Sequence, residues 1–263
     1  MPNPGGTVLI CARCHHFAAA PGTALCHLCQ GRSSEPAPVF DGTPGLWLRS
    51  PVGLGWAAAV LLGAVIAADL FAVCADLLQY DATGALADGE TGAAALRRAD
   101  RADVLSALAA GAQSVSLVSC VVVYLCWFRR VRANAQVFNP FGHRKSPGWA
   151  IGGWFVPVVS LWFPRRITLD IWDASSPWGA PRSHALVNAW WTLWLASLFA
   201  GRAATSGYGD AEGGAAQARD DALGMLLSDS LDIAAAVLAV LVVVRLTRMQ
   251  HEKAMAGAAP AAL

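Results

Sequence analysis

Apolar residues occur in five long stretches along this chain, and the polar residues gather between them. The stretches cover about residues 51–78, 104–128, 148–163, 184–201 and 223–244. A helix needs about 20 apolar residues to cross the ~30 Å hydrocarbon core of a bilayer. The pattern therefore predicts an all-α membrane protein whose principal partner is the lipid bilayer.

The third stretch, residues 148–163, differs from the other four. It is short, Pro147 and Pro164 flank it, and Pro157 lies inside it. Proline has no backbone N–H and breaks or kinks a helix. Two topologies are therefore open: five spanning helices, or four in two hairpins with a proline-broken segment that re-enters on one side.

The distribution of Lys and Arg favours the four-span topology. With the N-terminus inside, four spans place 14 of the 19 basic residues inside, whereas five spans place 10 there. Loops on the cytoplasmic side of a membrane carry an excess of these residues. We therefore expect four transmembrane helices with both termini cytoplasmic, plus a re-entrant or short fifth membrane segment.

The composition agrees with a location in the cell membrane. Only 14% of the residues are charged and 56% are hydrophobic, whereas soluble domains carry about 25% charged residues. The formal net charge is +1, which excludes a strong overall attraction to nucleic acid. We expect no nucleic-acid partner.

The polar N-terminal region contains two C-x-x-C pairs: Cys11, Cys14, Cys26 and Cys29. Each pair places two thiolates on one tight turn, and four thiolates form a closed tetrahedral site suited to zinc. We expect a small zinc ribbon with a structural zinc ion, since no ligand position remains for a substrate. A redox-active or disulfide-bonded pair is the alternative. Three neighbouring histidines could replace a cysteine ligand: His15, His16 and His27.

The chain divides by composition into four expected parts. Residues 1–34 form the zinc ribbon, and the proline-containing residues 35–50 form a linker. Residues 51–250 form a polytopic membrane domain, and residues 251–263 form a disordered tail. The first thirty residues lack the apolar core of a signal peptide.

Four acidic residues lie within or beside the apolar stretches. Asp69 and Asp76 are seven residues apart, and Asp229 and Asp232 are three apart, so each pair shares one helix face. Intramembrane carboxylates are candidates for a cation site or a proton relay. The alternative is structural: Asp76 and Asp229 lie at the membrane interface, and the other two pair with polar neighbours.

Residues 129–172 contain three spaced patterns, R-x-x-x-N-A, S-P-G-W-A-x-G-x-W-F-x-P-x-x-x-L-W-x-P and D-I-W. The residues that define them are Arg130, Asn134, Pro147, Gly148, Trp149, Trp154, Pro157, Trp162, Pro164, Asp170 and Trp172. These patterns resemble the core of an uncharacterised bacterial membrane family, domain of unknown function 4328, over about residues 50–250. The resemblance implies a polytopic membrane protein and no particular activity, with the zinc ribbon as an appended domain.

Two functions from different classes follow from these features. The favoured one is a non-enzymatic membrane protein whose cytoplasmic zinc ribbon docks a protein partner. The alternative is a small transporter or channel that uses the intramembrane carboxylates. An enzyme is disfavoured, because the sequence shows no Ser–His–Asp set, no phosphate-binding loop and no H-E-x-x-H motif.

Overall fold

The computed structural model describes residues 11–12, 19–20, 22–26, 48–90, 92–177, 179–206 and 215–256. The chain forms two compact units, Met1–Gly45 and Leu46–Leu263. Within the described residues, the second unit contains six α-helices and one short 3-10 helix. The prediction of an all-α membrane domain is confirmed for this part of the chain.

Four of the helices are long: α2 (Val52–Ala87), α3 (Ala93–Phe138), α6 (Ala185–Ser206) and α7 (Ala215–Ala256). Within the described residues, three helical segments are long and apolar enough to cross a membrane: Val52–Leu86, Ala93–Phe138 and Asp220–Ala256. They support a protein that passes through the membrane several times. Helix α6 is not among them.

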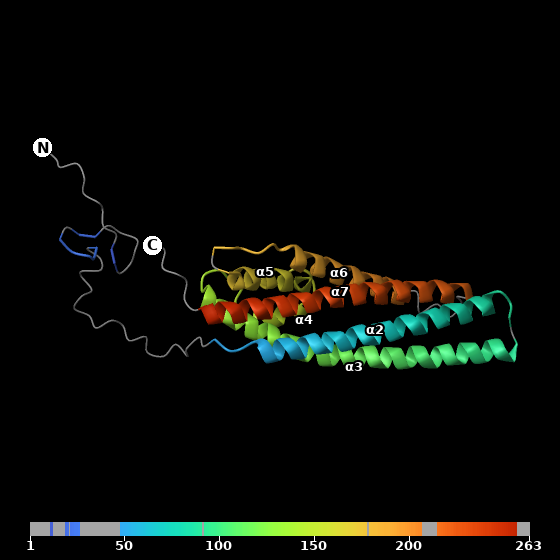
Figure 1. Ribbon diagram of the computed structural model, residues 1–263. Coiled ribbons are helices and arrows are strands. Elements are labelled where there is room, and N and C mark those ends of the chain that lie inside the picture. The colour runs from blue at the N-terminus through green and yellow to red at the C-terminus, as the bar shows by residue number, and fades with distance from the viewer. Residues whose placement is uncertain are drawn as a thin grey trace. The chain divides into compact units, whose positions relative to one another are not determined.

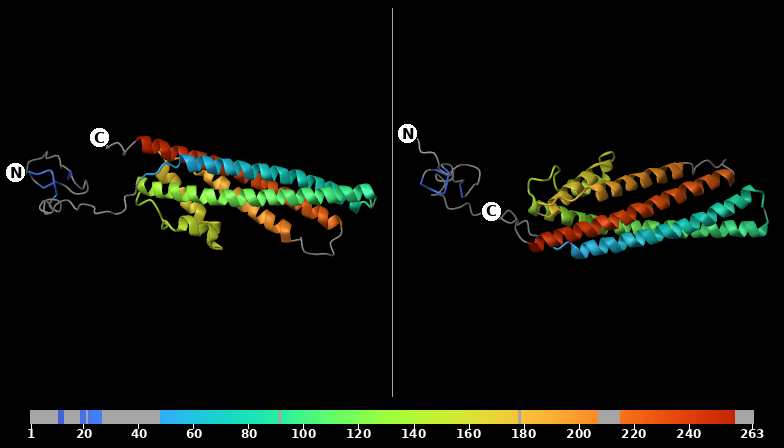
Figure 2. Two further views of the ribbon diagram at one scale, coloured as in Figure 1. Left: turned by 90° about the horizontal axis from the view of Figure 1, so that it is seen from below. Right: turned by 45° about the horizontal axis from the view of Figure 1, so that its top comes forward.

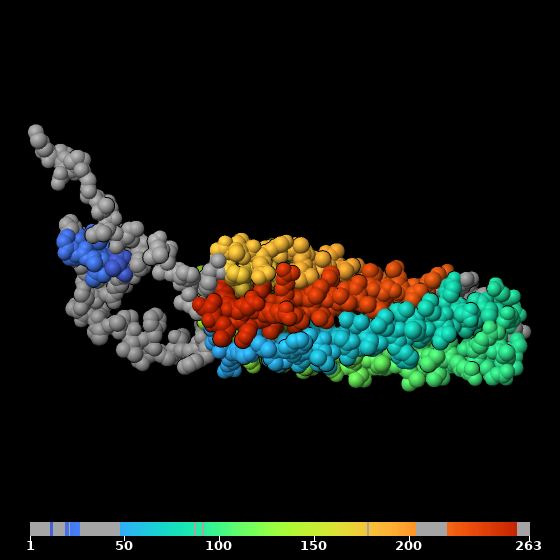
Figure 3. All heavy atoms as spheres, viewed as in Figure 1, coloured from blue at the N-terminus to red at the C-terminus, as the bar shows by residue number. Residues whose placement is uncertain are grey.

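The long helices pack in the order α3, α2, α7, α6. Helix α2 packs against both α3 and α7, and α6 packs against α7. Figures 1 and 2 show these helices lying side by side over much of their length. On the face drawn in Figure 3, α7 lies between α6 and α2. Two helical hairpins, α2–α3 and α6–α7, therefore pack through α2 and α7.

Three short elements connect the two hairpins: α4 (Trp149–Phe155), η1 (Val159–Leu161) and α5 (Phe163–Ser175). Before α4, the carbonyl of Lys145 accepts a hydrogen bond from Arg132 of α3 at 3.0 Å. After α5, the carbonyl of Ser176 accepts one from Lys253 of α7 at 2.8 Å. Both ends of the connection thus lie at the same end of the bundle, where α3 and α7 finish and α2 starts. We call this end the inner end of the bundle.

The helix breaks where the sequence predicts, at Pro157. Helix α4 ends at Phe155, and Val156 is extended. Val158 has φ 65° and ψ −53°, and the Val159 N–H donates to the Pro157 carbonyl at 2.7 Å. This is a γ-turn with positive φ, which is rare and strained for a β-branched residue. The proline-broken segment is therefore confirmed.

An aromatic core fixes this segment against the long helices. The Trp154 ring lies 5.6 Å from Tyr124, 6.0 Å from Phe128 and 5.8 Å from Trp194, measured between ring centroids. Edge-to-face pairs of this kind stabilise by about 0.5–1.5 kcal/mol each beyond their buried area. Helix α5 adds a buried Trp172 to the same core. The broken segment is thus packed against protein along one face.

The helices are longer than the sequence predicts. Most of the polar segment between the first two apolar stretches is helical, because α2 runs to Ala87 and α3 begins at Ala93. Helix α7 continues to Ala256, so residues 251–256 are helical rather than part of the tail expected over 251–263. Alanine is the strongest helix former, and it is frequent at these ends: Ala93, Ala94, Ala95, Ala215, Ala216 and Ala254.

Candidate intramembrane carboxylate site

Gln113 of α3 joins the two carboxylate-bearing helices. Its amide nitrogen donates to Asp69 Oδ1 of α2 at 3.1 Å and to Asp229 Oδ1 of α7 at 3.2 Å. The site residues predicted from the sequence do not include Gln113, although it is the one amide side chain in the uncharged stretch 104–128. That isolation in an apolar segment is the signal that could have identified it.

The other two predicted carboxylates join the same group. The carboxyl groups of Asp76 and Asp229 share a side-chain hydrogen bond, and the Ser197 hydroxyl of α6 contacts Asp232. Asp69 lies within electrostatic range of Asp229 and Asp232. The structure therefore brings the Asp69–Asp76 pair of α2 together with the Asp229–Asp232 pair of α7. We call these four aspartates and Gln113 the carboxylate site.

Asp69 is the most deeply buried member of the site, with 4% of its surface exposed. Its Oδ2 atom is buried and has no hydrogen-bond partner among the described residues, and the same holds for Asp76 Oδ2. The remaining three aspartates are half-buried. A buried carboxylate is unstable unless it is paired, hydrogen-bonded or protonated.

No cation of the described chain neutralises the site. The ion pairs in this part of the protein join Arg98 to Glu90 and His184 to Asp173, and both lie elsewhere. Within the described ranges, no three His, Cys, Asp or Glu side chains have an arrangement that could hold a metal ion. The four carboxyl groups therefore have no ion-pair partner among the described residues.

The site lies toward the end of the bundle opposite the inner end. At 1.5 Å per residue, Gln113 is about 24 Å along α3 from Arg129, and Asp229 is about 24 Å along α7 from Arg245. These arginines follow the apolar part of each helix at the inner end. A hydrocarbon core is ~30 Å thick, so the carboxylate site lies near the end of the apolar segments that is opposite these arginines.

The predicted zinc ligands lie partly outside the described residues. Cys11 and Cys26 are buried in the first unit, whereas Cys14 and Cys29 fall outside the described ranges. The Ala12 N–H donates to the Ala24 carbonyl at 2.8 Å, so the chain after Cys11 runs beside the chain before Cys26. This proximity fits two C-x-x-C turns that contribute to one tetrathiolate zinc site.

A buried polar network joins the elements of the inner end. The Asn134 amide donates to the carbonyl of Arg49 at 2.8 Å and to Gln250 Oε1 at 3.0 Å, and it accepts from the Arg49 N–H at 3.1 Å. Gln250 in turn donates to the Val131 carbonyl and to Ser175 Oγ. The start of α2 and the ends of α3, α5 and α7 are thereby held together.

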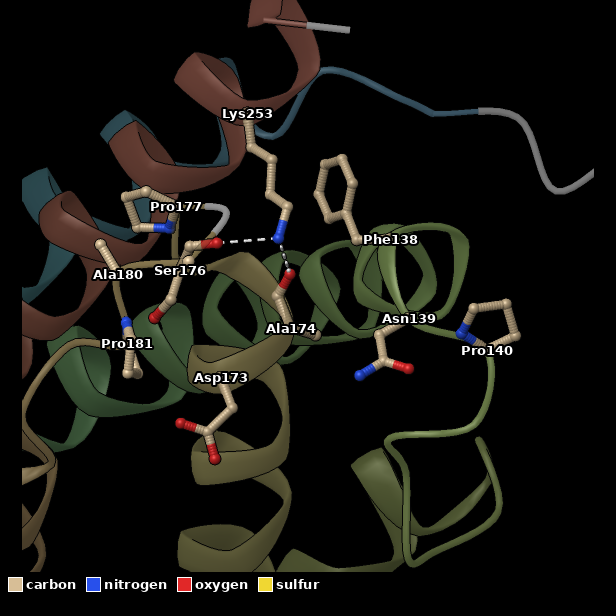
Figure 4. Close-up of a pocket in the computed structure, with 11 residues that line it drawn as sticks. Phe138, Asn139, Pro140, Asp173, Ala174, Ser176, Pro177, Ala180, Pro181 and Lys253 are labelled. Carbon is tan, nitrogen blue, oxygen red and sulfur yellow. Dashed lines mark hydrogen bonds between the residues drawn. The ribbon is translucent and has the colours of Figure 1, made fainter. Parts of the chain in front are cut away.

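A pocket of about 480 Å³ opens beside this network (Figure 4). The Lys253 ammonium lies at the pocket and donates to the carbonyls of Ala174 and Ser176, both at 2.8 Å. These carbonyls belong to the end of α5, where a cation is stabilising. Lys253 therefore caps the C-terminal end of α5.

A comparison with protein families matches residues 90–248 to the family described as Domain of unknown function (DUF4328). The chain belongs to this family. The match is narrower than the expected 50–250, and the DUF4328 region begins after α2. No similarity was found to a curated protein or to a solved structure.

The motif residues of the DUF4328 region have mainly structural contacts. Arg130 donates to the Ser50 carbonyl at 3.1 Å, and Asp170 accepts from the Arg144 N–H at 3.1 Å. Pro164 begins α5, and Trp149 packs on Phe163 with the ring centroids 5.0 Å apart. These contacts hold the broken segment and the inner end together, whereas the carboxylate site shares none of the motif residues.

Proposed function

We propose that this protein is a non-enzymatic transporter or channel that binds a proton or a small cation at the carboxylate site. The observation that carries the proposal is the bridge from Gln113 to both Asp69 and Asp229, in an apolar bundle without a neutralising cation among the described residues. Ionisable groups inside a membrane are costly and mark ion pathways. The geometry thus favours the transporter over the docking function that the sequence favoured.

The proposed topology has four spans, with α6 as the fourth. Helices α2 and α6 run away from the inner end, and α3 and α7 return to it (Figure 1). The return of the α4–α5 connection to the inner end supports a re-entrant segment. Because the basic residues are concentrated at this end, we place it, with both termini, in the cytoplasm.

Ion flux in proteoliposomes tests the proposal. Asp69→Asn removes a charge from the carboxylate site with little change in shape, and we expect at least a tenfold loss of proton or cation flux. Asp81→Asn is the matched control, because Asp81 is an exposed acid on the same helix. Equal flux in the wild type and both variants would contradict a role for the site.

A second candidate is a docking protein that binds a cytoplasmic partner through the N-terminal zinc ribbon. The hydrogen bond from Ala12 to Ala24, beside the buried Cys11 and Cys26, supports it. A closed tetrathiolate site holds zinc for structure alone. The ribbon would then present a fixed surface to its partner.

Metal content tests the zinc ribbon in the full chain. We expect one zinc ion per chain by elemental analysis and a loss of zinc in Cys26→Ser. Cys74→Ser is the control, because Cys74 lies in the middle of α2 and should leave the zinc content unchanged. Zinc-free protein with Cys11 and Cys26 in disulfides would instead support the redox alternative.

A further inference from the structure

We infer that the carboxylate site takes a proton, shared between Asp76 and Asp229 and exchanged with the outer side, rather than a metal cation. The inference rests on the proposed function and names the ion that this function would move. It is carried by three observations: the shared hydrogen bond, the direction of the Gln113 amide, and the burial of Asp69.

The contact between Asp76 and Asp229 requires a proton. Their carboxyl groups share a side-chain hydrogen bond, and an ionised carboxylate can only accept hydrogen bonds. Two carboxyl groups in hydrogen-bonding contact are not both ionised, so one of them carries the hydrogen. Binding forms an O–H bond on one carboxyl group as the proton leaves water, and no electron is transferred.

The Gln113 amide turns its donor nitrogen, and not its acceptor oxygen, toward the carboxyl groups. Its N–H groups, the positive end of the amide dipole, point at Asp69 Oδ1 and Asp229 Oδ1. A metal ion bridging these carboxylates would instead require the amide oxygen as a ligand. Hydrogen-bond donors stabilise carboxylates without adding a full charge, and no three acidic, His or Cys side chains of the described residues are arranged to hold a metal ion, so the arrangement favours a proton.

Asp69 provides an independent acceptor in the interior. Asp69 is only 4% exposed. Its Oδ1 accepts a hydrogen bond from Gln113, whereas its Oδ2 has no partner among the described residues. An acceptor left unpaired in this way destabilises the fold, and protonation or a bound water would relieve that cost. Asp69 is therefore a second proton acceptor of the site.

The groups that face the site come from four helices. Helix α2 contributes Asp69 and Asp76, α3 contributes Gln113, α6 contributes Ser197, and α7 contributes Asp229 and Asp232. None of these groups is basic, so the proton affinity is set by the carboxyl groups and by the donors Gln113 and Ser197. Asp76 and Asp229 are half-buried and lie toward the outer end, which makes them the entry to the site.

Infrared difference spectroscopy of the detergent-solubilised full chain tests the inference directly. We expect a carboxylic C=O band near neutral pH that shifts in D₂O, and we expect Asp76→Asn and Asp229→Asn each to remove it. Asp81→Asn should keep the band, because Asp81 is exposed. Both variants are checked by size-exclusion chromatography, and a variant that aggregates is left out, so that the other one decides the result.

Absence of the band at neutral pH in the wild type would overturn the inference. Flux measurements on the same preparation separate this failure from that of the proposed function. Sodium, potassium or calcium flux without a carboxylic band would retain a cation transporter and reject the proton. A band without any flux would retain the shared proton and reject the transporter.

Discussion

Gln113 shows how one side chain can determine the geometry of a membrane-embedded site. Its two hydrogen bonds connect α3 to α2 and to α7 at one depth, although few other contacts join α3 to α7. Without it, Asp69 and Asp229 would lose their only amide donor among the described residues. The separation of the carboxylates therefore depends on a residue that carries no charge.

Replacement of Gln113 by leucine should destabilise the bundle. Gln113→Leu leaves two carboxyl oxygens without donors, and each buried unsatisfied group costs about 1–3 kcal/mol. We expect a lower melting temperature in detergent, with a smaller loss at low pH, where protonated carboxyls no longer need a donor. Gln136→Leu on the same helix is the control, because no hydrogen bond of its side chain is seen in the structure. Equal melting of both variants would argue against the bridge.

His143 should make part of the stability depend on pH. This histidine lies between α3 and α4, and burial lowers its pKa below the ordinary 6.5, with a smaller contribution from Arg132. The folded chain therefore disfavours the charged imidazole, so its stability is complete above pH 6.5 and decreases as the pH falls below that value. The decrease is at most about 1.4 kcal/mol per pH unit for one proton. Melting scans of His143→Gln should show a weaker decrease between pH 6.5 and 5 than the wild type.

At the scale of elements, the α4–η1–α5 connection combines a strained turn with a tightly packed core. Val158 holds a positive φ at the break, and its side chain is 64% exposed. Packing on either side maintains the turn, because Trp154 precedes it and the buried Ile167 follows it. Pro157 identified this break in the sequence, whereas the positive φ of Val158 could not be predicted, since valine normally avoids it.

Glycine at position 158 should relieve the strain. A non-glycine residue in such a conformation costs about 1–3 kcal/mol, and little apolar surface is lost on removing an exposed valine. We expect Val158→Gly to melt at or above the temperature of the wild type. Val156→Gly should melt below the wild type, with a free energy of unfolding lower by about 0.5–1 kcal/mol, because Val156 has an ordinary φ of −79°. If Val158→Gly lost as much stability as Val156→Gly, the γ-turn would be wrong.

At the scale of the whole molecule, the helical spacing predicted which acids share a face but not which faces meet. The rotation of α2, α3 and α7 about their axes is set by packing, such as the hydrogen bond from Trp127 to Thr247 at 3.0 Å. Gly55 also lies against Thr247, where a larger residue would clash. Hydropathy located the three candidate membrane helices of the described residues. It missed the helix ends, because alanine-rich helices continue beyond the apolar residues.

Labelling of introduced cysteines tests the arrangement of the whole chain in the membrane. In the proposed topology, Ala180→Cys lies at the cytoplasmic end, whereas Ala94→Cys lies at the outer end, and both positions are exposed. An impermeant maleimide added to intact cells should label Ala94→Cys alone, and permeabilised cells should show both. Labelling of Ala180→Cys in intact cells would establish that residues 148–163 span the membrane.

The depth of the carboxylate site has an electrical consequence. The site lies about 24 Å from the inner arginines of a ~30 Å core, so a proton arriving from outside crosses only about one-fifth of the membrane field. One charge that crosses the whole field changes its energy by about 2.3 kcal/mol per 100 mV. A potential of 100 mV therefore changes the free energy of proton binding from outside by about 0.5 kcal/mol, and that of release to the inside by about 1.8 kcal/mol. Occupancy of the site should thus be nearly independent of membrane potential, and the inward step should carry most of the voltage dependence.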